Sequence, residues 1–412
     1  MLKNIKISNF KSIDEEIELS FEPVNSEFNE YYLTDDKLLK LALIYGPNAS
    51  GKTNIIKAIE FIRNFIFNPP ISKEEKIKIT PFKFTDTINL NSKFILEFIE
   101  NNFLFLYEIE LNKDKVEKEI LKFKDLNLKN PKFALVFQRD EEIKWGSKIK
   151  IKKSQKENIA LNTLPNNLLL SGYLKVNLEI EELERVIKFL KKILPPIYPN
   201  TDLLGFVLDK LESKKVLKEE IIKILKNADF AIDDFIIEEQ DADEEVIEFF
   251  KKIGKKIDDL KKIEIFFKHF QKYNLEFKEE SRGTQRFYQL AVILALLAKN
   301  SYIVPIDEIE SSLHPDLLKF FILIFLTNAK NSQLILTTHT RELLLEKDIL
   351  RKDTIWFCEK RENSSTDLFS LSDFGSEIRD KSSIYNYYKY GKIGAIPNIK
   401  NFLGLFDEEK KE

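Results

Sequence analysis

The chain has 412 residues, of which 43% are hydrophobic and 32% are charged, so it can build a substantial core and a well-solvated surface. Lys and Arg total 65 against 68 Asp and Glu, and the resulting net charge of −3 argues against a strongly basic, histone-like binder of nucleic acid. The single cysteine, Cys358, excludes an intrachain disulfide and favours a reducing, cytoplasmic location. The amino terminus lacks a signal-peptide core, and apolar runs such as 320–326 are far shorter than the ~20 residues of a membrane helix, so no membrane partner is expected.

Strand patterns dominate the first part of the chain. Apolar residues alternate over 2–22, a continuous apolar run covers 39–45, and helical periodicity follows over 54–66. Residues 92–139 alternate apolar with polar side chains, which predicts antiparallel strands. Six lysines then fall within 141–156, and they indicate either a solvated hairpin face or a contact with nucleic-acid phosphates.

The middle of the chain changes character. Residues 176–272 are rich in Lys and Glu at amphipathic helical spacing, without sustained heptads, and predict a compact helical subdomain. Helix and strand patterns alternate again from 279 to about 371, and the tail 408–412 is charged. We therefore predict an α/β fold in three parts: an N-terminal lobe with a β subdomain over 1–175, a helical insertion over 176–272, and a C-terminal lobe over 273–412.

A phosphate-binding motif follows the apolar run 39–45. The sequence GPNASGKT fits G-x-x-x-x-G-K-[ST] at every fixed position. Glycines let backbone N–H groups approach phosphates, the helix start favours anions, the lysine reaches the β- and γ-phosphates of ATP, and the following hydroxyl is a Mg²⁺ ligand. We predict that ATP and Mg²⁺ bind here, with Lys52 catalytic and Thr53 a metal ligand. The predicted nucleotide-binding residues of this loop are Gly46, Pro47, Asn48, Ala49, Ser50, Gly51, Lys52, Thr53 and Asn54.

An acidic pair ends a second apolar run, 301–306, and resembles a Walker B motif. Asp307 is the expected second Mg²⁺ ligand, and Glu308 is the expected catalytic group that polarises the attacking water. A distance of 255 residues separates Lys52 from Asp307, far more than in a minimal P-loop domain. Residues 141–272 are therefore predicted to be inserted between the two motifs.

A third motif, ESRGTQR at 280–286, opens an apolar helical pattern and resembles the signature motif of ABC-type ATPases. Arg282 departs from the glycine that is commonest at its position. A serine hydroxyl and a glycine N–H at a helix start form a cradle for anions. The resemblance implies that Ser281 and Gly283 bind the γ-phosphate of ATP held by the other protomer. Two of only nine arginines, Arg282 and Arg286, fall in this motif, which suggests contact with an anion.

Two histidine-containing segments complete the series. Residues 309–315 (IESSLHP) resemble a D-loop, in which His314 is expected to stabilise the turn. The strand pattern over 333–338 ends at His339, which resembles a switch histidine and is predicted to be catalytic through a hydrogen bond to the γ-phosphate. His269 is assigned a structural place in an amphipathic helix. The three histidines are too scattered to suggest a metal centre, and no Q-loop is assigned, because Gln138 lacks a supporting context.

Five segments of the chain resemble the motifs of the RecF/Rad50/SMC-related ABC-type ATPases. In chain order they are KISNFKSI, GPNASGKT, ESRGTQRF, DEIESSLHP and TTH. The resemblance is closest to the compact AAA-15/AAA-21 group, which includes the RloA/AbiLi-type ATPases of abortive-infection and anti-phage operons. It spans nearly the whole chain and is weakest over 176–272. It implies an ABC-type P-loop ATPase head with an inserted antiparallel β region, a homodimer or higher homo-oligomer, and an operon-encoded effector protein. Only 73 residues follow His339, too few for the Toprim nuclease domain of OLD-type proteins, so nuclease or toxin chemistry is expected in that separate partner.

Two functions remain open at this point. The first is an ATPase that dimerises on ATP and controls a separate nuclease or toxin in anti-phage defence. The alternative is a compact RecF-like ATPase of DNA repair that binds nucleic acid, although the low arginine count argues mildly against it. The missing coiled-coil arms argue against Rad50 and SMC proteins, and the signature motif argues against a metabolic kinase or GTPase.

Overall fold

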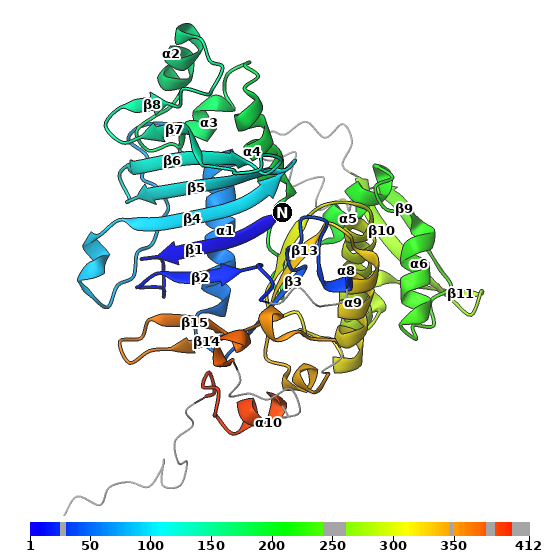
Figure 1. Ribbon diagram of the computed structural model, residues 1–412. Helices are drawn as coiled ribbons and strands as arrows, with labels where there is room; N and C mark the ends of the chain where they lie inside the picture. The colour runs from blue at the N-terminus through cyan, green and yellow to red at the C-terminus, as the bar shows by residue number, and fades with distance from the viewer. Residues whose placement is uncertain (25–29, 242–260, 347–348, 376–383, 398–412) are drawn as a thin grey trace, which may run out of the picture. The chain divides into compact units, whose positions relative to one another are not determined.

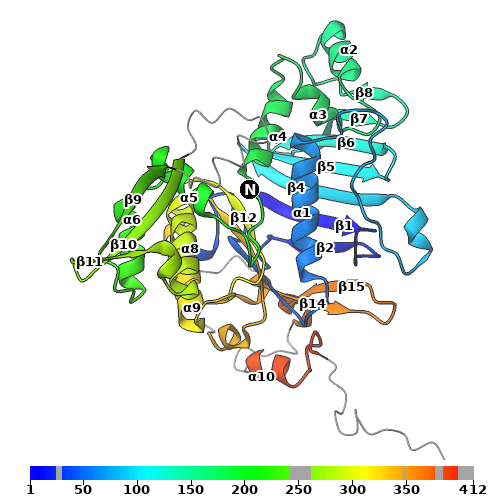
Figure 2. The same cartoon turned by 180° about the vertical axis from the view of Figure 1, so that it is seen from behind.

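The computed structural model of the chain describes residues 1–24, 30–241, 261–346, 349–375 and 384–397 (Figures 1 and 2). The chain divides into two compact units, each with its own core. The P-loop unit, which carries the GPNASGKT motif, comprises Leu2–Val24, Ala42–Lys191 and Ile335–Glu412. The signature unit, which carries the ESRGTQR motif, comprises Met1, Asn25–Leu41 and Lys192–Leu334.

A seven-stranded antiparallel sheet is the largest element of the P-loop unit. Its strands run in the order β2-β1-β4-β5-β6-β7-β8. Side chains of β4 are alternately buried and half-buried, as the period of two in the sequence requires. The predicted antiparallel strands are thus confirmed, with bounds β1 Leu2–Ser8, β2 Ile17–Ser20, β4 Ser92–Glu100, β5 Phe103–Leu111, β6 Val116–Asp125, β7 Ala134–Arg139 and β8 Ile143–Trp145.

Helix α1 (Lys52–Phe67) crosses one face of this sheet, behind the strands in Figure 1 and in front of them in Figure 2. Its apolar side faces the strands, and the Phe61 ring lies 5.8 Å from Phe10 and 5.4 Å from Phe94 between centroids. Helix α4 (Glu181–Lys192) also packs on the sheet, where Phe189 stacks on Phe98 of β4 at 3.9 Å. Two shorter helices, α2 Lys153–Leu161 and α3 Leu169–Tyr173, follow β8.

A second sheet of the P-loop unit positions the phosphate-binding motif. Its strands run in the order β13-β3-β14-β15, with β14 parallel to β3 and antiparallel to β15. Every residue of β3 is buried, as the continuous apolar run predicts. The bounds are β3 Leu41–Tyr45, β13 Gln333–Thr338, β14 Ile355–Lys360 and β15 Thr366–Ser370, and the short helix α10 covers Ile384–Lys389.

The signature unit is built around helix α8 (Arg282–Lys299), which is buried over most of its length. Helices α5, α6 and α9 contact it. Phe235, Phe267 and Phe277 surround the ring of Tyr288 on α8, with centroids 5.0–5.9 Å away. The remaining bounds are α5 Leu204–Glu212, α6 Lys218–Asn227, β9 Asp234–Asp241, β10 Lys261–His269, β11 Tyr273–Glu276, β12 Ile303–Ile306 and α9 Pro315–Asn328.

The predicted helical character of 176–272 is only partly correct. Helices α4, α5 and α6 form there, but β9 and β10 pair antiparallel within a three-stranded sheet, so the helical prediction is wrong for 234–241 and 261–269. His269 accordingly ends a strand rather than lying in a helix. Much of the Lys/Glu-rich stretch lies at 242–260, outside the described residues, as does the charged tail 408–412, and the three-part domain division remains a prediction.

None of the helices over the described ranges is long and apolar enough to cross a membrane.

Candidate functional site

The loop between β3 and α1 contains two glycines, Gly46 and Gly51, at which any side chain would clash with neighbouring atoms. Gly51 has φ of +110°, and a Cβ there would lie 1.9 Å from Thr366 Oγ1. A Cβ on Gly46 would lie 2.2 Å from the carbonyl oxygen of Cys358. Ala49 between them also takes a left-handed backbone, with φ of 62°. The loop therefore curls tightly against β14 and β15 before α1 begins.

The start of α1 has the properties of an anion site. Its N-cap is Gly51, no side chain caps the first turn, and that turn contains no acidic residue. The Ser50 hydroxyl is buried and has no hydrogen-bond partner among the described residues. Lys52 is 6% exposed, and its Nζ donates to the carbonyl oxygens of Gly46 at 2.9 Å and Pro47 at 3.0 Å. Uncapped N–H groups, the helix dipole and one ammonium group fit the phosphates of a nucleotide.

A chain of hydrogen bonds between side chains connects this loop to β15 and to the segment after β1. Asn54 Nδ2 donates to Ser12 Oγ at 2.6 Å, Ser12 Oγ lies 2.6 Å from Thr366 Oγ1, and Thr366 Oγ1 donates to the Ser50 carbonyl at 2.9 Å. The same carbonyl accepts from Cys358 Sγ at 3.3 Å, and burial raises the pKa of this thiol to about 12. Sequence patterns gave no indication of Thr366, and the only signal for Ser12 was its place in the KISNFKSI run.

The remaining predicted residues of the P-loop unit lie at the ends of its elements. Thr53 is half-buried in the first turn of α1, and Pro47, Asn48 and Ala49 line the outer side of the loop with partly or fully exposed side chains. His339 directly follows the fully buried β13 and is itself half-buried. It therefore occupies the strand-end position that the sequence predicts.

In the signature unit, Ser281 is exposed and caps α8. Its Oγ accepts from the Thr284 N–H at 3.1 Å and lies 2.8 Å from Thr284 Oγ1. A Cβ on Gly283 would lie 3.0 Å from the carbonyl oxygen of Ser312, so the 309–315 turn packs directly on this part of α8. Capping and close packing explain why serine and glycine stand at these two positions.

The acidic pair follows β12. Asp307 is 4% exposed, and its N–H donates to the Ile197 carbonyl at 2.8 Å, while Glu308 is half-buried with a left-handed φ of 45°. Left-handed backbone at a glutamate is costly and is typical of functional turns. His314 caps α9 by accepting from the Asp316 N–H at 3.2 Å, as expected for a residue that stabilises the turn.

The predicted site residues thus form two groups. The P-loop unit contains Gly46 to Asn54 and His339. The signature unit contains Ser281, Gly283, Asp307 and Glu308. Within the ranges that the structure describes, no cluster of three His, Cys, Asp or Glu side chains could hold a metal ion. A Mg²⁺ ion that uses a threonine hydroxyl, one carboxylate and phosphate oxygens does not require such a cluster.

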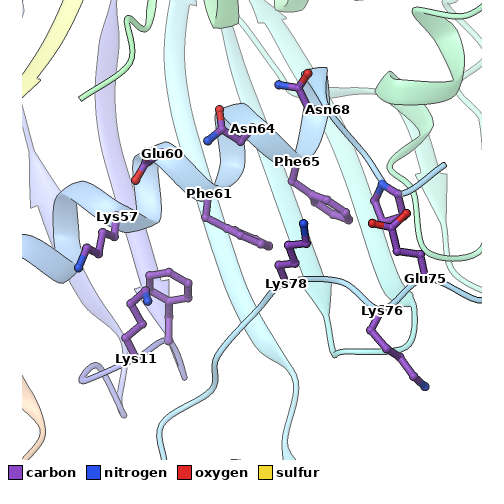
Figure 3. Close-up of a pocket in the computed structure, with 12 residues that line it drawn as sticks. Lys11, Lys57, Glu60, Phe61, Asn64, Phe65, Asn68, Glu75, Lys76 and Lys78 are labelled. Atoms are coloured by element: carbon purple, nitrogen blue, oxygen red, sulfur yellow. The ribbon is translucent and has the colours of Figure 1, made fainter. Parts of the chain in front are cut away.

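A pocket of about 380 Å³ lies beside α1 in the P-loop unit (Figure 3). Phe61 and Phe65 form its apolar side, and Figure 3 shows Lys78 reaching toward α1 beneath these rings. Lys11, Lys57 and Lys78 all line the pocket, and no carboxylate of the described residues lies within ion-pair distance of them. Burial and the neighbouring Lys57 lower the pKa of Lys11.

Residues 41–346, about three-quarters of the chain, match the sequence pattern of the AAA-21 family, described as "AAA domain, putative AbiEii toxin, Type IV TA system". The chain belongs to this family. The predicted AAA-21 resemblance is thereby confirmed, and the protein is a member of an AAA-domain ATPase family. The closer likeness to the RloA/AbiLi type remains a prediction.

Solved structures of SMC heads are similar over most of this AAA-21 protein. The SMC head domain from Thermotoga maritima has 14% identity and a TM-score of 0.42, covering 90% of this chain and 98% of that one. An SMC head bound to the C-terminal winged-helix domain of ScpA has 14% identity and a TM-score of 0.45, covering 90% and 99%. An SMC head with an extended coiled coil, bound to the C-terminal domain of ScpA from Pyrococcus furiosus, has 14% identity and a TM-score of 0.39, covering 90% and 97%. No curated protein matches the sequence.

Proposed function

We propose that this AAA-21 protein binds and hydrolyses ATP with Mg²⁺, dimerises on ATP, and thereby controls a separate effector in defence against phage. The observation that carries the proposal is the start of α1: glycines at which a side chain would clash, a first turn without a side-chain cap at Gly51, and the buried side chain of Lys52. A loop of this kind binds phosphates through backbone N–H groups and a helix dipole. Family membership supports the same reading.

The predicted roles follow from chemistry. Lys52, which donates to loop carbonyls in this structure, would exchange those acceptors for phosphate oxygens. Thr53 and Asp307 would hold Mg²⁺, an ion that prefers oxygen ligands and neutralises charge on the terminal phosphates. Glu308 would orient and deprotonate water, and His339 would donate to the γ-phosphate.

Dimerisation on ATP is supported by the exposure of the signature turn. Ser281 is exposed, and its oxygen already caps α8, so it can still turn a hydroxyl proton outward to an approaching phosphate. The N–H groups of the α8 first turn and the dipole of an 18-residue helix favour the same anion. A second copy that carries ATP in its own P-loop would supply that phosphate.

The effector role is supported by the motif resemblance to anti-phage operon ATPases and by the toxin–antitoxin description of the family. An ATP-gated dimer offers a simple means of control, because a partner protein can bind one state and not the other. The partner we propose is an operon-encoded nuclease or toxin.

The decisive experiment uses Glu308→Gln, which keeps size and hydrogen bonding but removes the charge. Hydrolysis should fall by roughly 10²–10⁴, as for a lost general base, while ATP binding survives. ATP and Mg²⁺ should then hold the variant as a dimer in light scattering and small-angle X-ray scattering, whereas wild type dimerises only transiently.

Asp307→Asn is the matched control, because it weakens Mg²⁺ binding itself and should not give the stable dimer. Identical mass and shape of Glu308→Gln with and without ATP would exclude the ATP-gated dimer and leave a plain P-loop hydrolase.

The alternative, a RecF-like ATPase that binds nucleic acid, is favoured by the pocket beside α1. Its lysines, which outnumber the two glutamates of its lining, Glu60 and Glu75, and its phenylalanine rings suit phosphates and stacked bases. If this function holds, oligonucleotide affinity should fall steeply with salt and should drop further in Lys57→Gln/Lys78→Gln at unchanged ATP turnover. Absence of oligonucleotide binding at 50 mM salt would exclude it.

A further inference from the structure

Arg286 of α8 has no counter-ion within the part of the chain that the structure describes. It is 6% exposed, and its Nε, Nη1 and Nη2 atoms have no hydrogen-bond acceptor among the described residues. Burial alone lowers its pKa, since no carboxylate opposes the loss of water. Because a guanidinium group stays charged, the fold buries a positive charge and five N–H donors with nothing to receive them.

The two other buried arginines of the described ranges show how this chain normally treats such a group. Arg351 is 7% exposed and pairs with Asp353 through two bonds, Nε to Oδ1 at 2.8 Å and Nη2 to Oδ2 at 2.6 Å. Arg139 is 9% exposed, donates to the carbonyls of Asn167 and Leu164, and lies 3.6 Å from Glu119. Arg286 is therefore the exception in a chain that otherwise pairs its buried guanidinium groups.

Helix geometry places Arg286 close to the signature turn. Residues three and four positions apart share a face, and helical side chains lean toward the helix start, so Arg286 extends over Arg282 and Gly283. Gly283 contributes no side chain, and Ser312 of the 309–315 turn covers it. The guanidinium group thus belongs to the region where α8 begins and that turn packs.

The covering turn is itself strained. Glu308 and Ser312 both have left-handed backbones, with φ of 45° and 64°. Non-glycine residues in this conformation cluster at switch regions, where a second conformation relieves the cost. The buried cation of Arg286 and the left-handed residues Glu308 and Ser312 are two separate energetic penalties, and an anion delivered to α8 would remove the first.

We propose that Arg286 is a latent phosphate-binding residue, without a partner among the described residues, which gains its counter-ion when a second copy presents the terminal phosphate of bound ATP to the start of α8. The proposal rests on the proposed ATP-gated dimer and adds to it the residue that senses the phosphate. It also predicts that ATP and not ADP supports dimerisation, because only the triphosphate carries the terminal group to the partner. Arginine suits this task, since its planar fork matches phosphate oxygens.

The test compares Arg286→Met with Arg351→Met, two substitutions of equally buried arginines by an apolar residue of similar length. Without nucleotide, Arg286→Met should raise the melting temperature by a few degrees, because it removes an unpaired buried charge. Arg351→Met should lower it, because it leaves Asp353 buried without its partner. A fall in the melting temperature of Arg286→Met like that of Arg351→Met would overturn the proposal, since it would mean that Arg286 has a structural partner.

The second arm measures dimerisation with ATP and Mg²⁺ in a Glu308→Gln background. Arg286→Met should bind a fluorescent ATP analogue within about twofold of its parent, yet need at least tenfold more protein to dimerise, and Arg286→Lys should recover part of this loss. Equal dimerisation of Arg286→Met and its parent would overturn the role of Arg286 alone. Failure of the Glu308→Gln parent to dimerise would overturn the proposed function, and this inference with it.

Discussion

Replacing Gly51 by alanine should destabilise the P-loop unit by several kcal/mol. Backbone strain and the loss of hydrogen bonds of Thr366 both contribute to this cost. The backbone φ of +110° is one that alanine rarely adopts, which costs about 1–3 kcal/mol. The new Cβ would also lie 1.9 Å from Thr366 Oγ1 and must displace it. Thr366 would then lose its bonds to the Ser50 carbonyl and to Ser12 Oγ, each contributing about 1 kcal/mol.

The expected total is about 3–5 kcal/mol, or a fall of roughly 6–20 °C in the melting temperature at about 2–4 °C per kcal/mol. Thermal unfolding followed by circular dichroism measures it. Gly205→Ala is the matched control, because Gly205 lies in α5 and nothing stands within 4 Å of its Cβ position. That substitution should be neutral or stabilise by up to about 1 kcal/mol, as helical alanine replaces glycine.

A double-mutant cycle separates strain from steric overlap. Thr366→Gly removes the side chain that Gly51→Ala would strike, so Gly51→Ala should cost at least about 1 kcal/mol less in that background. The geometric argument would be refuted by a cost below about 1 kcal/mol for Gly51→Ala alone. Strict additivity of the two substitutions would refute the steric part.

Three further predictions concern the same two units. Lys52→Ala should abolish nucleotide binding or reduce turnover by about 10²–10³, measured as phosphate release, and near-normal turnover of the pure variant would refute the assignment. Ser281→Arg should bind ATP but not hydrolyse it, and mixing it with Lys52→Ala should restore some activity through one intact composite site; no recovery in proven mixed dimers would refute the trans arrangement. Folding raises the pKa of Cys358 from an ordinary 9.0 to about 12, so the unfolded chain releases this proton first and stability falls by about 1.4 kcal/mol per pH unit across that interval. Urea unfolding at pH 8 and pH 10 should show a shallower fall for Cys358→Ala, and an unchanged fall would refute this origin.

The elements around the phosphate-binding loop could be predicted because their signals are local. A continuous apolar run predicts β3, and helical periodicity predicts α1. The spacing of glycine, lysine and threonine predicts the loop between them. The strand that ends at His339 was found in the same way. These segments have patterns and packing that agree, so propensity and tertiary structure point to the same answer.

The strands at 234–241 and 261–269 were predicted as helices because their Lys and Glu content resembles that of the neighbouring helices. Lys and Glu are common here, as in the neighbouring helices, yet the alternation in Ile265 and Phe267, which are both buried, was the stronger signal. β10 also pairs on both sides, with β9 and β11, and this pairing is a tertiary contribution that overrides helical propensity.

Some features of the candidate site could not be found in the sequence at all. Thr366 supports Ser50 from more than 300 residues away, so only the folded chain brings them together. The sequence did single out Arg286 as a suggested anion contact, but its lack of a partner is a property of its surroundings. Such features arise only in the folded chain, because they depend on which side chains are close in space rather than on which are near in the sequence.

The starts of the two helices α1 and α8 imply an order of events. At α1 the N-cap Gly51 has no side chain to cap the first turn, and Lys52 Nζ donates to two carbonyls of its own loop, so this end can take a phosphate with little rearrangement. At α8 the Ser281 oxygen already satisfies the Thr284 N–H, so this end offers fewer free donors. Nucleotide should therefore bind first to the P-loop of one copy, with an affinity independent of protein concentration. The signature turn of a second copy should join afterwards, in a step that depends on protein concentration and on the terminal phosphate.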